Sequence, residues 1–414
     1  MYLLFDCNNF FASCEQVFRP DWRRRPLVVL SNNDGCVVSR SPEAKAMGIA
    51  MGEPYFQCKA RLEAARAVVC SANFSLYTDL SERIMILLDE ALPDVQQYSV
   101  DEAFARVDNL HDWEPYCRTL RNSIRRGTGI TVSVGIAPTR TLCKLANEAA
   151  KHHPKYDGVV ALTTPDDWQP LLEETPVGDV WGVGRRLTPR MHALGIRTAA
   201  GLARCGLNYL RKHFGVHGER LALELNGTSC LDDAEPPVRQ QIMVSRSLKD
   251  GVSDLATLRE ALCRFVEKAG RILRQEGMMC STLYVLLRTS RYREAEQLYA
   301  ANQGVALGCP TDDTRELTHA ATALLEQQLF RPGFEYKKIG VLLTGLQKVE
   351  LVQPTFEHPH VAPSKLMAVL DKLQKAGHHI HFANQGRKEP WHRSFASPAY
   401  TTRWQDIPET SPRL

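Results

Sequence analysis

The stretch YSVDEAF, residues 98–104, places two adjacent acids, Asp101 and Glu102, inside an otherwise apolar, strand-forming run. Burying two neighbouring carboxylates is unfavourable, because like charges repel strongly where water is scarce. A folded chain tolerates such a pair most readily when a cation neutralises it. Successive side chains of a strand point to opposite faces, so both acids can reach one cation only at a hairpin turn or a bulge, which we predict here.

A third acid, Asp6, has the same setting at the end of the apolar run YLLFD, residues 2–6. Carboxylates at strand ends suit Mg²⁺, which binds one or two of them and takes its other ligands from water and substrate phosphates. Two such ions about 4 Å apart serve phosphoryl transfer. Each acid taken alone is equally well explained as a solvated residue at a strand end or turn, so the hypothesis of a metal site depends on their coming together.

The composition limits the alternatives. A chain of 414 residues has room for several domains, and 44% hydrophobic and 24% charged residues are ordinary for a water-soluble protein. The net charge of +4 is too small to indicate nucleic-acid binding for the whole chain. We find no apolar run that could span a bilayer and no signal-peptide pattern, and we expect no membrane partner. The twelve cysteines include no Cys-x-x-Cys pair, which argues against a zinc finger and favours a reducing cytoplasm.

Strand and helix signals alternate through the first 165 residues. Strands are predicted at 2–6, 27–30, 36–39, 67–70 and 130–136 and on both sides of Asp101, and helices at 10–17, 42–47, 76–92, 113–126 and 139–151. Strands separated by helices, with one hairpin that carries acids, indicate a split βαβ, ferredoxin-like sheet into which residues 24–77 are inserted. From residue 175 the pattern is helical, and residues 238–345 are typical of a separate small α+β domain.

A glycine-rich segment, WGVGRR at residues 181–186, precedes one of the predicted helices. Gly182 and Gly184 let the backbone approach a phosphate closely, and amides at a helix start can donate to it. Arg185 and Arg186 add positive charge in a region where basic residues outnumber acids. The segment resembles a helix–hairpin–helix, which binds the backbone of a duplex without reading its sequence. The alternative is a simple helical corner with exposed arginines.

Two aromatic residues, Phe10 and Phe11, follow the first candidate ligand. They are either core residues or a surface for the sugar of an incoming nucleotide, where a bulky ring would exclude a ribose 2′-hydroxyl sterically. Two segments, residues 39–45 and 144–151, supply hydroxyls and cations near predicted helix ends, among them Ser39, Lys45, Lys144 and Lys151. Such residues are either ordinary solvated surface or contacts to a triphosphate.

Several separated blocks of sequence carry a resemblance to a known family. They are DCNNFFA at 6–12, SNNDGCVV at 31–38, YSVDEAF at 98–104 and DVWGVGRR at 179–186, with FANQG at 382–386 and SPAYTTR at 397–403 near the end. With these blocks in this order, the chain resembles the Y-family DNA polymerases, in particular the UmuC-type catalytic subunits of bacterial DNA polymerase V. The resemblance implies an α+β multidomain fold shaped like a right hand. Its parts would be a ferredoxin-like palm (1–25 and 76–165), small fingers (26–75), a helical thumb with the helix–hairpin–helix (166–236), an α+β, DNA-binding little finger (237–346) and a C-terminal partner-binding tail (347–414).

The resemblance also implies roles for individual residues. The catalytic carboxylates, which with the carbonyl of Cys7 would bind two Mg²⁺ ions, fall on Asp6, Asp101 and Glu102. The nucleotide contacts fall on Phe10, Phe11, Ser39, Lys45 and Lys151. The DNA contacts fall on Gly182, Gly184, Arg185 and Arg186. Phe11 corresponds to the aromatic that excludes ribonucleotides, which is Tyr in many relatives. Pro42 stands where many relatives have a tyrosine that contacts the triphosphate, so that contact is absent or replaced here.

The activity that the resemblance implies is error-prone translesion synthesis in the SOS response to DNA damage, with dNTPs added to a primer-template. The implied partners are a processed UmuD-type dimer and RecA, and the implied location is the bacterial cytoplasm at the nucleoid. A peptide that binds the sliding clamp is expected after the little finger, but the matching stretch VQPTF, residues 352–356, has its glutamine displaced. The alternatives are a nucleotide cyclase, which would need no DNA, and a non-catalytic DNA-binding scaffold that has kept the fold.

Overall fold

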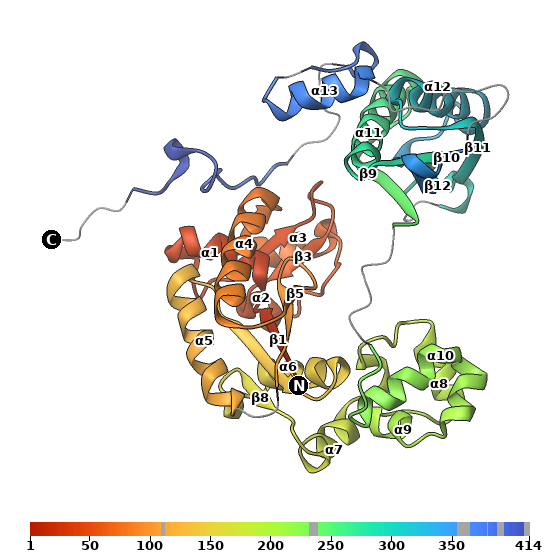
Figure 1. Ribbon diagram of the computed structural model, residues 1–414. Helices are drawn as coiled ribbons and strands as arrows, with labels where there is room; N and C mark the ends of the chain where they lie inside the picture. Colours follow the sequence, from red (N-terminus) through yellow and green to blue (C-terminus); the bar gives the residue numbers. More distant parts are fainter. Residues whose placement is uncertain are drawn as a thin grey trace. The chain divides into compact units, whose positions relative to one another are not determined.

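The computed structural model describes residues 1–108, 112–231, 239–290, 292, 294–353, 365–378, 380–386 and 393–409 (Figure 1). The chain forms two compact units. The first comprises Met1–Glu235 together with Phe395–Leu414, and the second comprises Pro236–Ser394. Each unit has its own sheet and hydrophobic core. Among the described residues, no helix combines the length and the apolar character needed to cross a membrane.

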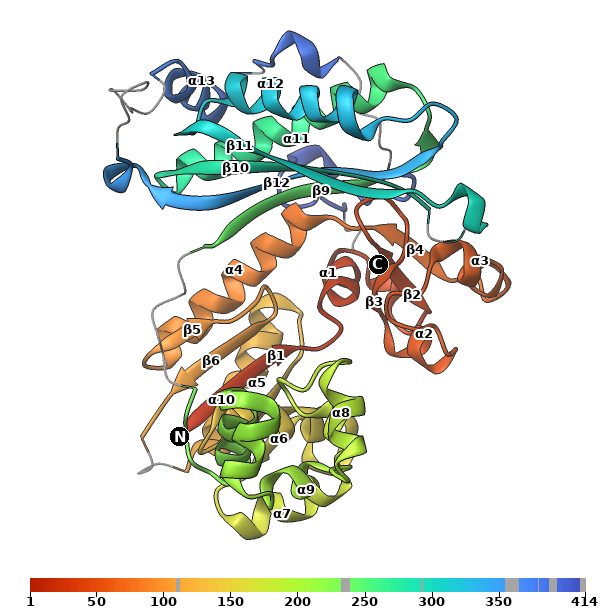
Figure 2. The same ribbon diagram turned by 90° about the vertical axis from the view of Figure 1, so that its right-hand side faces the viewer.

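The first unit is built on a five-stranded sheet. Its strands, in spatial order, are β5 (Val95–Gln97), β6 (Glu102–Arg106), β1 (Tyr2–Cys7), β7 (Val132–Ala137) and β8 (Val159–Ala161). β1 is central and antiparallel to both β6 and β7, whereas β8 runs parallel to β7. Figure 2 shows β5, β6 and β1 side by side. Apart from the added β8, this is the strand order of the split βαβ sheet, so the ferredoxin-like prediction is confirmed.

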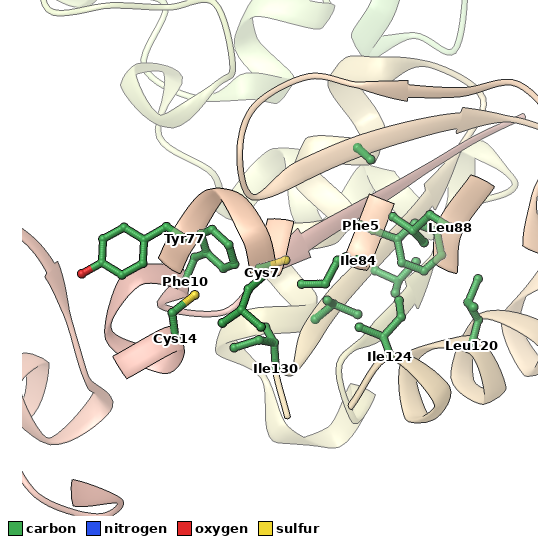
Figure 3. Packing of buried hydrophobic residues seen from close by; sticks show 14 of the residues in the cluster. Phe5, Cys7, Phe10, Cys14, Tyr77, Ile84, Leu88, Leu120, Ile124 and Ile130 are labelled. Carbon is green, nitrogen blue, oxygen red and sulfur yellow. The ribbon is translucent and has the colours of Figure 1, made fainter. Parts of the chain in front are cut away.

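Three helices cover the two faces of this sheet. They are α4 (Phe74–Ala91) and α5 (Trp113–Thr128) on one face and α6 (Arg140–His152) on the other. The alternation of side chains along β1 supplies both cores. Leu3 and Phe5 pack with α4 and α5 in the cluster of Figure 3, whereas Tyr2 and Leu4 pack with α6. Asp6 continues the second set, so its carboxylate lies on the α6 face.

A second sheet of short strands is inserted between β1 and α4, as predicted. Its elements are β2 (Leu27–Leu30), β3 (Val37–Arg40) and β4 (Val68–Ser71), with α1 (Phe10–Phe18), α2 (Pro42–Ala46) and α3 (Tyr55–Ala64) around them. β2 and β3 form the expected hairpin, and β4 runs parallel to β2 at the edge of the sheet. Asp34 in the hairpin turn has a φ of 54°, the left-handed conformation that Asn and Asp tolerate. α3 lies outside the predicted elements.

A helical region follows the two sheets along the chain, as the sequence predicted. They are α7 (Pro165–Glu174), α8 (Leu187–Ala193), α9 (Ala199–Ala203) and α10 (Leu207–Leu225). Leu202, Leu210 and Leu221 from these helices share one hydrophobic core with Leu142 of α6. The helical region is therefore packed against α6, the helix that covers one face of the five-stranded sheet.

The second unit is an antiparallel sheet covered by helices on one face (Figure 2). Its strands, in spatial order, are β11 (Ala300–Thr311), β10 (Met278–Thr289), β12 (Tyr336–Lys348) and β9 (Gln241–Val252), and its helices are α11 (Leu255–Gln275), α12 (Thr314–Leu324) and α13 (Lys365–Lys375). The predicted α+β character is confirmed. The two strands at the edges of this sheet, β9 and β11, were missed. The boundaries predicted at 237 and 347 stay predictions.

Gly135 of β7 lies directly against α6. A Cβ there would overlap the carbonyl oxygen of Cys143 and crowd the amide nitrogen of Asn147, both backbone atoms of α6. We expect Gly135→Ala to lower the free energy of unfolding by about 1–3 kcal/mol, measured by denaturant titration, because the helix must move off the sheet. Gly127→Ala in α5 is the matched control, since its methyl would meet only the flexible end of Leu87. Equal losses in both variants would contradict this packing.

Candidate active site

The pairing of β1 with β6 places two of the three predicted carboxylates opposite each other. Asp6 pairs with Glu102 across the antiparallel strands, and Leu4 pairs with Phe104 two residues along. Side chains of paired residues lie on one face of a sheet, with Cβ atoms about 4.5–5.5 Å apart. Asp6 is 8% exposed, and Glu102 is partly buried. The two carboxylates therefore face α6 together, at the end of an apolar surface.

Asp101 lies in the hairpin turn between β5 and β6. The amides of Tyr98 and Ser99 both donate to the carbonyl of Glu102, at 2.9 and 3.1 Å, so strand alternation is interrupted here, as predicted. The carbonyl of Asp101 accepts a hydrogen bond from the amide of Cys7 at 2.8 Å, which holds the turn against the end of β1. Ser99 Oγ donates to Asp101 Oδ1 at 2.6 Å. The backbone thus brings all three acids to one end of two adjacent strands, while the side chain of Asp101 is held within its own turn.

Two lysines of α6 reach the paired carboxylates. Lys144 Nζ lies 2.5 Å from Glu102 Oε1. Lys151 Nζ lies 2.8 Å from Asp6 Oδ2 and 2.9 Å from Glu148 Oε1. The two lysines are two helical turns apart, so they share one face of α6. Lys151 was predicted as a site residue, whereas Lys144 was considered only as one of the cations of residues 144–151 and was given no role of its own.

The carboxylate pair is not fully ionised near neutral pH. Burial raises the pKa of Asp6 to about 7, with the neighbouring Glu102 adding to the rise and the charge of Lys151 opposing it. Burial acts in the same direction on Glu102, but hydrogen bonding with Asp6 and the contact with Lys144 outweigh it and hold the pKa of that carboxyl below its usual value. The two carboxyls therefore titrate as one coupled pair, in which Asp6 is harder to ionise than an isolated carboxyl.

The donor set suits a hard cation by its chemistry, because three carboxylates and the carbonyl of Cys7 offer only oxygen. A buried carboxyl whose pKa has risen to about 7 is one that a nearby cation would return to its ionised form. Within the described ranges, no three or more acidic, histidine or cysteine side chains are already gathered as a metal site. Asp6 and Glu102 meet, and the Asp101 side chain does not join them. The residues fit Mg²⁺ by donor type, and the two lysines contact the carboxylates that it would bind.

The two predicted nucleotide aromatics have different surroundings. Phe10 is 3% exposed and belongs to the hydrophobic cluster of Figure 3. Phe11 is partly exposed, and its ring stacks on Tyr77 with centroids 4.4 Å apart and planes 13° apart. Phe74 lies edge-on to Phe11 at 6.0 Å. Phe11 is thus the ring with open surface, and the assignment of both rings to the nucleotide stays a prediction.

Ser39 lies at the end of β3 and is buried. Its hydroxyl accepts a hydrogen bond from the amide of Ala12 at 3.2 Å and donates to the carbonyl of Asn9 at 3.3 Å. These contacts join β3 to the first turn of α1, which carries the aromatic pair. The hydroxyl therefore has a structural role in the described state, and its predicted contact with a nucleotide stays a prediction.

Lys45 of α2 lies in a basic patch. Burial of its side chain and the nearby charges of Arg40 and Lys151 lower the pKa of Lys45, while Asp6 opposes this effect weakly. The structure therefore brings together two lysines that are 106 residues apart in the sequence, as the nucleotide-contact prediction requires. Arg40 lies within the predicted segment 39–45 but was not assigned a contact of its own.

The glycine-rich loop lies before α8. Gly182 has a φ of 94°, which favours glycine, and its carbonyl oxygen lies 2.9 Å from His217 Nε2. Gly184 has open space around it, where a Cβ would meet no atom within 4 Å. Arg185 and Arg186 are exposed. The loop thus has two exposed glycines and the charge that a phosphate contact requires.

Trp181 joins this loop to the acidic hairpin. Its ring centroid lies 5.8 Å from that of Tyr98 and 6.2 Å from that of Phe104. Lys144 Nζ lies 5.7 Å from the same ring. The glycine-rich loop and the hairpin that bears the acids are therefore linked through packed aromatic rings within the first unit.

Comparison with known proteins relates these features to a family. Residues 5–148 match the impB/mucB/samB family, 239–356 its C-terminal domain, 165–196 the IMS family HHH motif and 364–409 the domain of unknown function DUF4113. Over 421 residues the chain is 42% identical to protein UmuC of Salmonella typhimurium strain LT2, with 98% of this chain and 99% of that protein covered. The chain belongs to the impB/mucB/samB family.

Membership of the impB/mucB/samB family confirms the UmuC-type resemblance, and the motif match confirms the helix–hairpin–helix. DNA polymerase IV of Caulobacter vibrioides is 30% identical over 344 residues, with 82% of each chain covered. The solved Y-family DNA polymerase chimera Dbh-Dpo4(243-245)-Dbh has a TM-score of 0.67 at 24% identity, covering 84% of this chain and 100% of that one. This likeness confirms the Y-family polymerase fold. The roles of the individual site residues stay predictions.

The contact between Lys151 and Asp6 is expected to stabilise the metal-free fold. Lys151→Met should lower the free energy of unfolding, because Asp6 then lacks a counter-charge, and Asp6→Asn should remove most of that effect. A double-mutant cycle in EDTA should give an interaction energy of about 0.5–3 kcal/mol. The control cycle uses Lys59 and Glu63, an exposed pair 3.7 Å apart whose interaction should be below about 0.5 kcal/mol. Additive effects of the Lys151 and Asp6 substitutions would show that their contact does not stabilise the fold.

Proposed function

We propose that this chain, an error-prone translesion DNA polymerase by its family, adds deoxynucleotides to a primer 3′-hydroxyl at the ends of β1 and β6. The observation that carries this proposal is the cross-strand pairing of Asp6 with Glu102, beside the turn that holds Asp101. Nucleotidyl transfer requires positioning and charge stabilisation, and no covalent intermediate with the protein. A cluster of acids bordered by cations and by an exposed aromatic ring supplies both.

The three acids bind and orient the reactants. Asp6, Asp101 and Glu102, with the carbonyl of Cys7, would hold two Mg²⁺ ions, which when bound lower the pKa of the primer hydroxyl and neutralise the triphosphate and the leaving pyrophosphate. The contribution of the sheet is to fix two of the acids in one register, since a shift by one residue would turn one of them to the opposite face.

The basic patch receives the triphosphate. The charges of Arg40 and Lys151 disfavour the charge of Lys45, and a bound polyanion would relieve such repulsion. Lys151 contacts Asp6 in the described state, and its ammonium would be free to contact the phosphates if that carboxylate held a metal ion instead. Ser39, near the end of β3, contributes its hydroxyl.

The aromatic pair selects the sugar. The exposed face of Phe11 packs under the deoxyribose and leaves no room for a 2′-hydroxyl, while Phe10 anchors the start of α1 in the core. Tyr77 supports the Phe11 ring from behind through the stacked contact. A phenylalanine in this position excludes by shape alone, because it lacks the hydroxyl of a tyrosine.

The glycine-rich loop binds the backbone of the primer-template. Gly182 and Gly184 expose their amides, and Arg185 and Arg186 carry the charge that pairs with phosphates. Contacts of this kind hold a duplex without regard to its sequence, as a polymerase must.

The partners are those of the UmuC-type resemblance. We propose a processed UmuD-type dimer and RecA as partners in the SOS response, in the cytoplasm at the nucleoid. The sliding clamp is a further proposed partner through residues 352–356, of which Val352 and Gln353 are described and 354–356 lie outside the described residues. The tail that follows is the expected partner-binding part of the chain.

Loss of one metal-binding acid is expected to abolish synthesis. Asp101→Asn should reduce primer extension past an abasic site, in Mg²⁺, by at least about 100-fold, because a charged ligand becomes neutral. The assay is run with and without activated RecA and a processed UmuD-type dimer, and Asp89→Asn, an exposed acid on α4, is the control. Full extension by Asp101→Asn would make the site assignment wrong. Intact duplex binding without any synthesis by the unaltered protein would favour the scaffold, and DNA-independent turnover of GTP or ATP would favour the cyclase.

Removal of the exposed ring is expected to relax sugar selection. Phe11→Ala should raise the ratio of kcat/KM for a ribonucleotide over the matching deoxynucleotide by about 10–100-fold, since the space for a 2′-hydroxyl opens. Tyr116→Ala, at a ring 42% exposed on α5, is the control and should leave the ratio unchanged. A ratio that does not change in Phe11→Ala would assign sugar selection to another residue.

A further inference from the structure

The C-terminal segment of the chain packs on the first unit, although the residues before it in the sequence belong to the second unit. Its described part, residues 393–409, lies within the stretch that matches a domain of unknown function. It contacts four elements of the first unit: the edge strand β4, the start of α3, the helix α1 that carries Phe11, and the start of α4.

The first contact covers the edge of β4. The amide of Ser71 donates to the carbonyl of Phe395 at 2.8 Å, and the amide of Phe395 donates to Ser71 Oγ at 3.0 Å. Ala396 continues this pairing as a parallel bridge to Ser71. The ring of Phe395 lies edge-on to Tyr55 at 5.5 Å. The segment thereby satisfies backbone groups that an edge strand leaves open.

The second contact centres on Glu15 of α1, which has no exposed surface. Its Oε1 accepts hydrogen bonds from Tyr77 Oη at 2.7 Å and from Ser397 Oγ at 3.1 Å. Ser397 Oγ accepts in turn from Asn73 Nδ2 at 3.0 Å. Burial raises the pKa of Glu15 to about 7, and the two hydroxyl donors oppose this rise. A buried carboxyl thus depends on the tail for one of its two donors.

Tyr77 connects this network to the nucleotide site. One face of its ring stacks on Phe11, and its phenol oxygen points away from the hydrophobic cluster (Figure 3), toward Glu15. A third contact of the tail is with α1, where Tyr400 stacks on Phe18 with ring centroids 4.8 Å apart and ring planes 3° apart. The helix that bears Phe11 is therefore held by the tail at two points, and the ring behind Phe11 is held at its hydroxyl.

We propose that the segment Phe395–Tyr400 is a positioning element of the nucleotide site, which holds Tyr77 through Glu15 and so fixes the Phe11 ring against ribonucleotides. This inference rests on the proposed role of Phe11 in sugar selection. Ser397 and Glu15 are positioning residues, because they act on the nucleotide only through Tyr77 and Phe11. Without the segment, water reaches Glu15, and the Tyr77 hydroxyl loses its fixed acceptor.

The test measures the ribonucleotide over deoxynucleotide ratio of kcat/KM with full-length protein, in whichever partner condition supports extension. This ratio does not depend on the fraction of active enzyme, so a merely structural defect does not move it. We expect Ser397→Ala and Glu15→Ala each to raise the ratio by about 10-fold, since a misplacement of 1 Å is worth up to about 100-fold. Glu15→Gln keeps an acceptor oxygen and should restore most of the selectivity. Trp404→Ala, at a tail side chain 90% exposed, should leave the ratio unchanged.

A chain that ends at Ser394 provides a second variant and should give the same rise as Ser397→Ala. Ser397→Ala added to Phe11→Ala should give no further rise, because the ring through which the tail acts is gone. If Phe11→Ala raises the ratio while Ser397→Ala and the shortened chain do not, the positioning role of the tail is wrong and the proposed function stands. If Phe11→Ala itself leaves the ratio unchanged, the assigned role of Phe11 is wrong, and the inference about the tail falls with it.

Discussion

Two carboxylates that face each other across antiparallel strands are the constraint on which the rest of the site depends. The register that pairs Asp6 with Glu102 places like charges side by side where little water reaches, and such a pair persists only with positive charge nearby. α6 provides it from two residues spaced by two turns. That helix can lie close enough only because β7 has a glycine, Gly135, beneath it. The charge pair, the helix spacing and the close packing are therefore parts of one arrangement.

Two buried acids, Asp6 and Glu15, lie on either side of Phe11 in the sequence. They are stabilised in different ways. Asp6, before it in the sequence, is paired with an ammonium that can move away on a flexible side chain. Glu15, after it, receives only neutral hydroxyl donors within a closed network. The first acid is thus suited to exchange its partner for a substrate or a metal, and the second to hold its surroundings in place. In the sequence, Phe11 therefore lies between an acid that can exchange its partner, Asp6 of β1, and an acid that is held in place, Glu15 of α1.

Local signals in the sequence were sufficient for much of the fold. Apolar alternation and turn residues predicted β1, the hairpin at Asp101 and the inserted sheet, because each depends on residues near one another in the chain. The same signals failed for β11, an exposed edge strand, and for α3, whose apolar pattern is weak. At the site, the acids were found from their apolar surroundings. The pairing of Lys144 with Glu102 could not be predicted, because no local signal in the sequence indicates which face of α6 lies over which strand.

The contacts of the tail join residues that are synthesised at very different times. Asn73 and Ser397 are 324 residues apart, and Glu15 and Ser397 are 382 apart. At about 5–20 residues per second, a ribosome needs roughly 15–65 s to pass from Asn73 to Ser397 and roughly 20–75 s to pass from Glu15 to Ser397. During that time β4 has an open edge and Glu15 lacks one donor, in a nascent chain whose first unit is otherwise complete. A site that needs residues 395–400 becomes selective only in a polymerase molecule that has been translated through them.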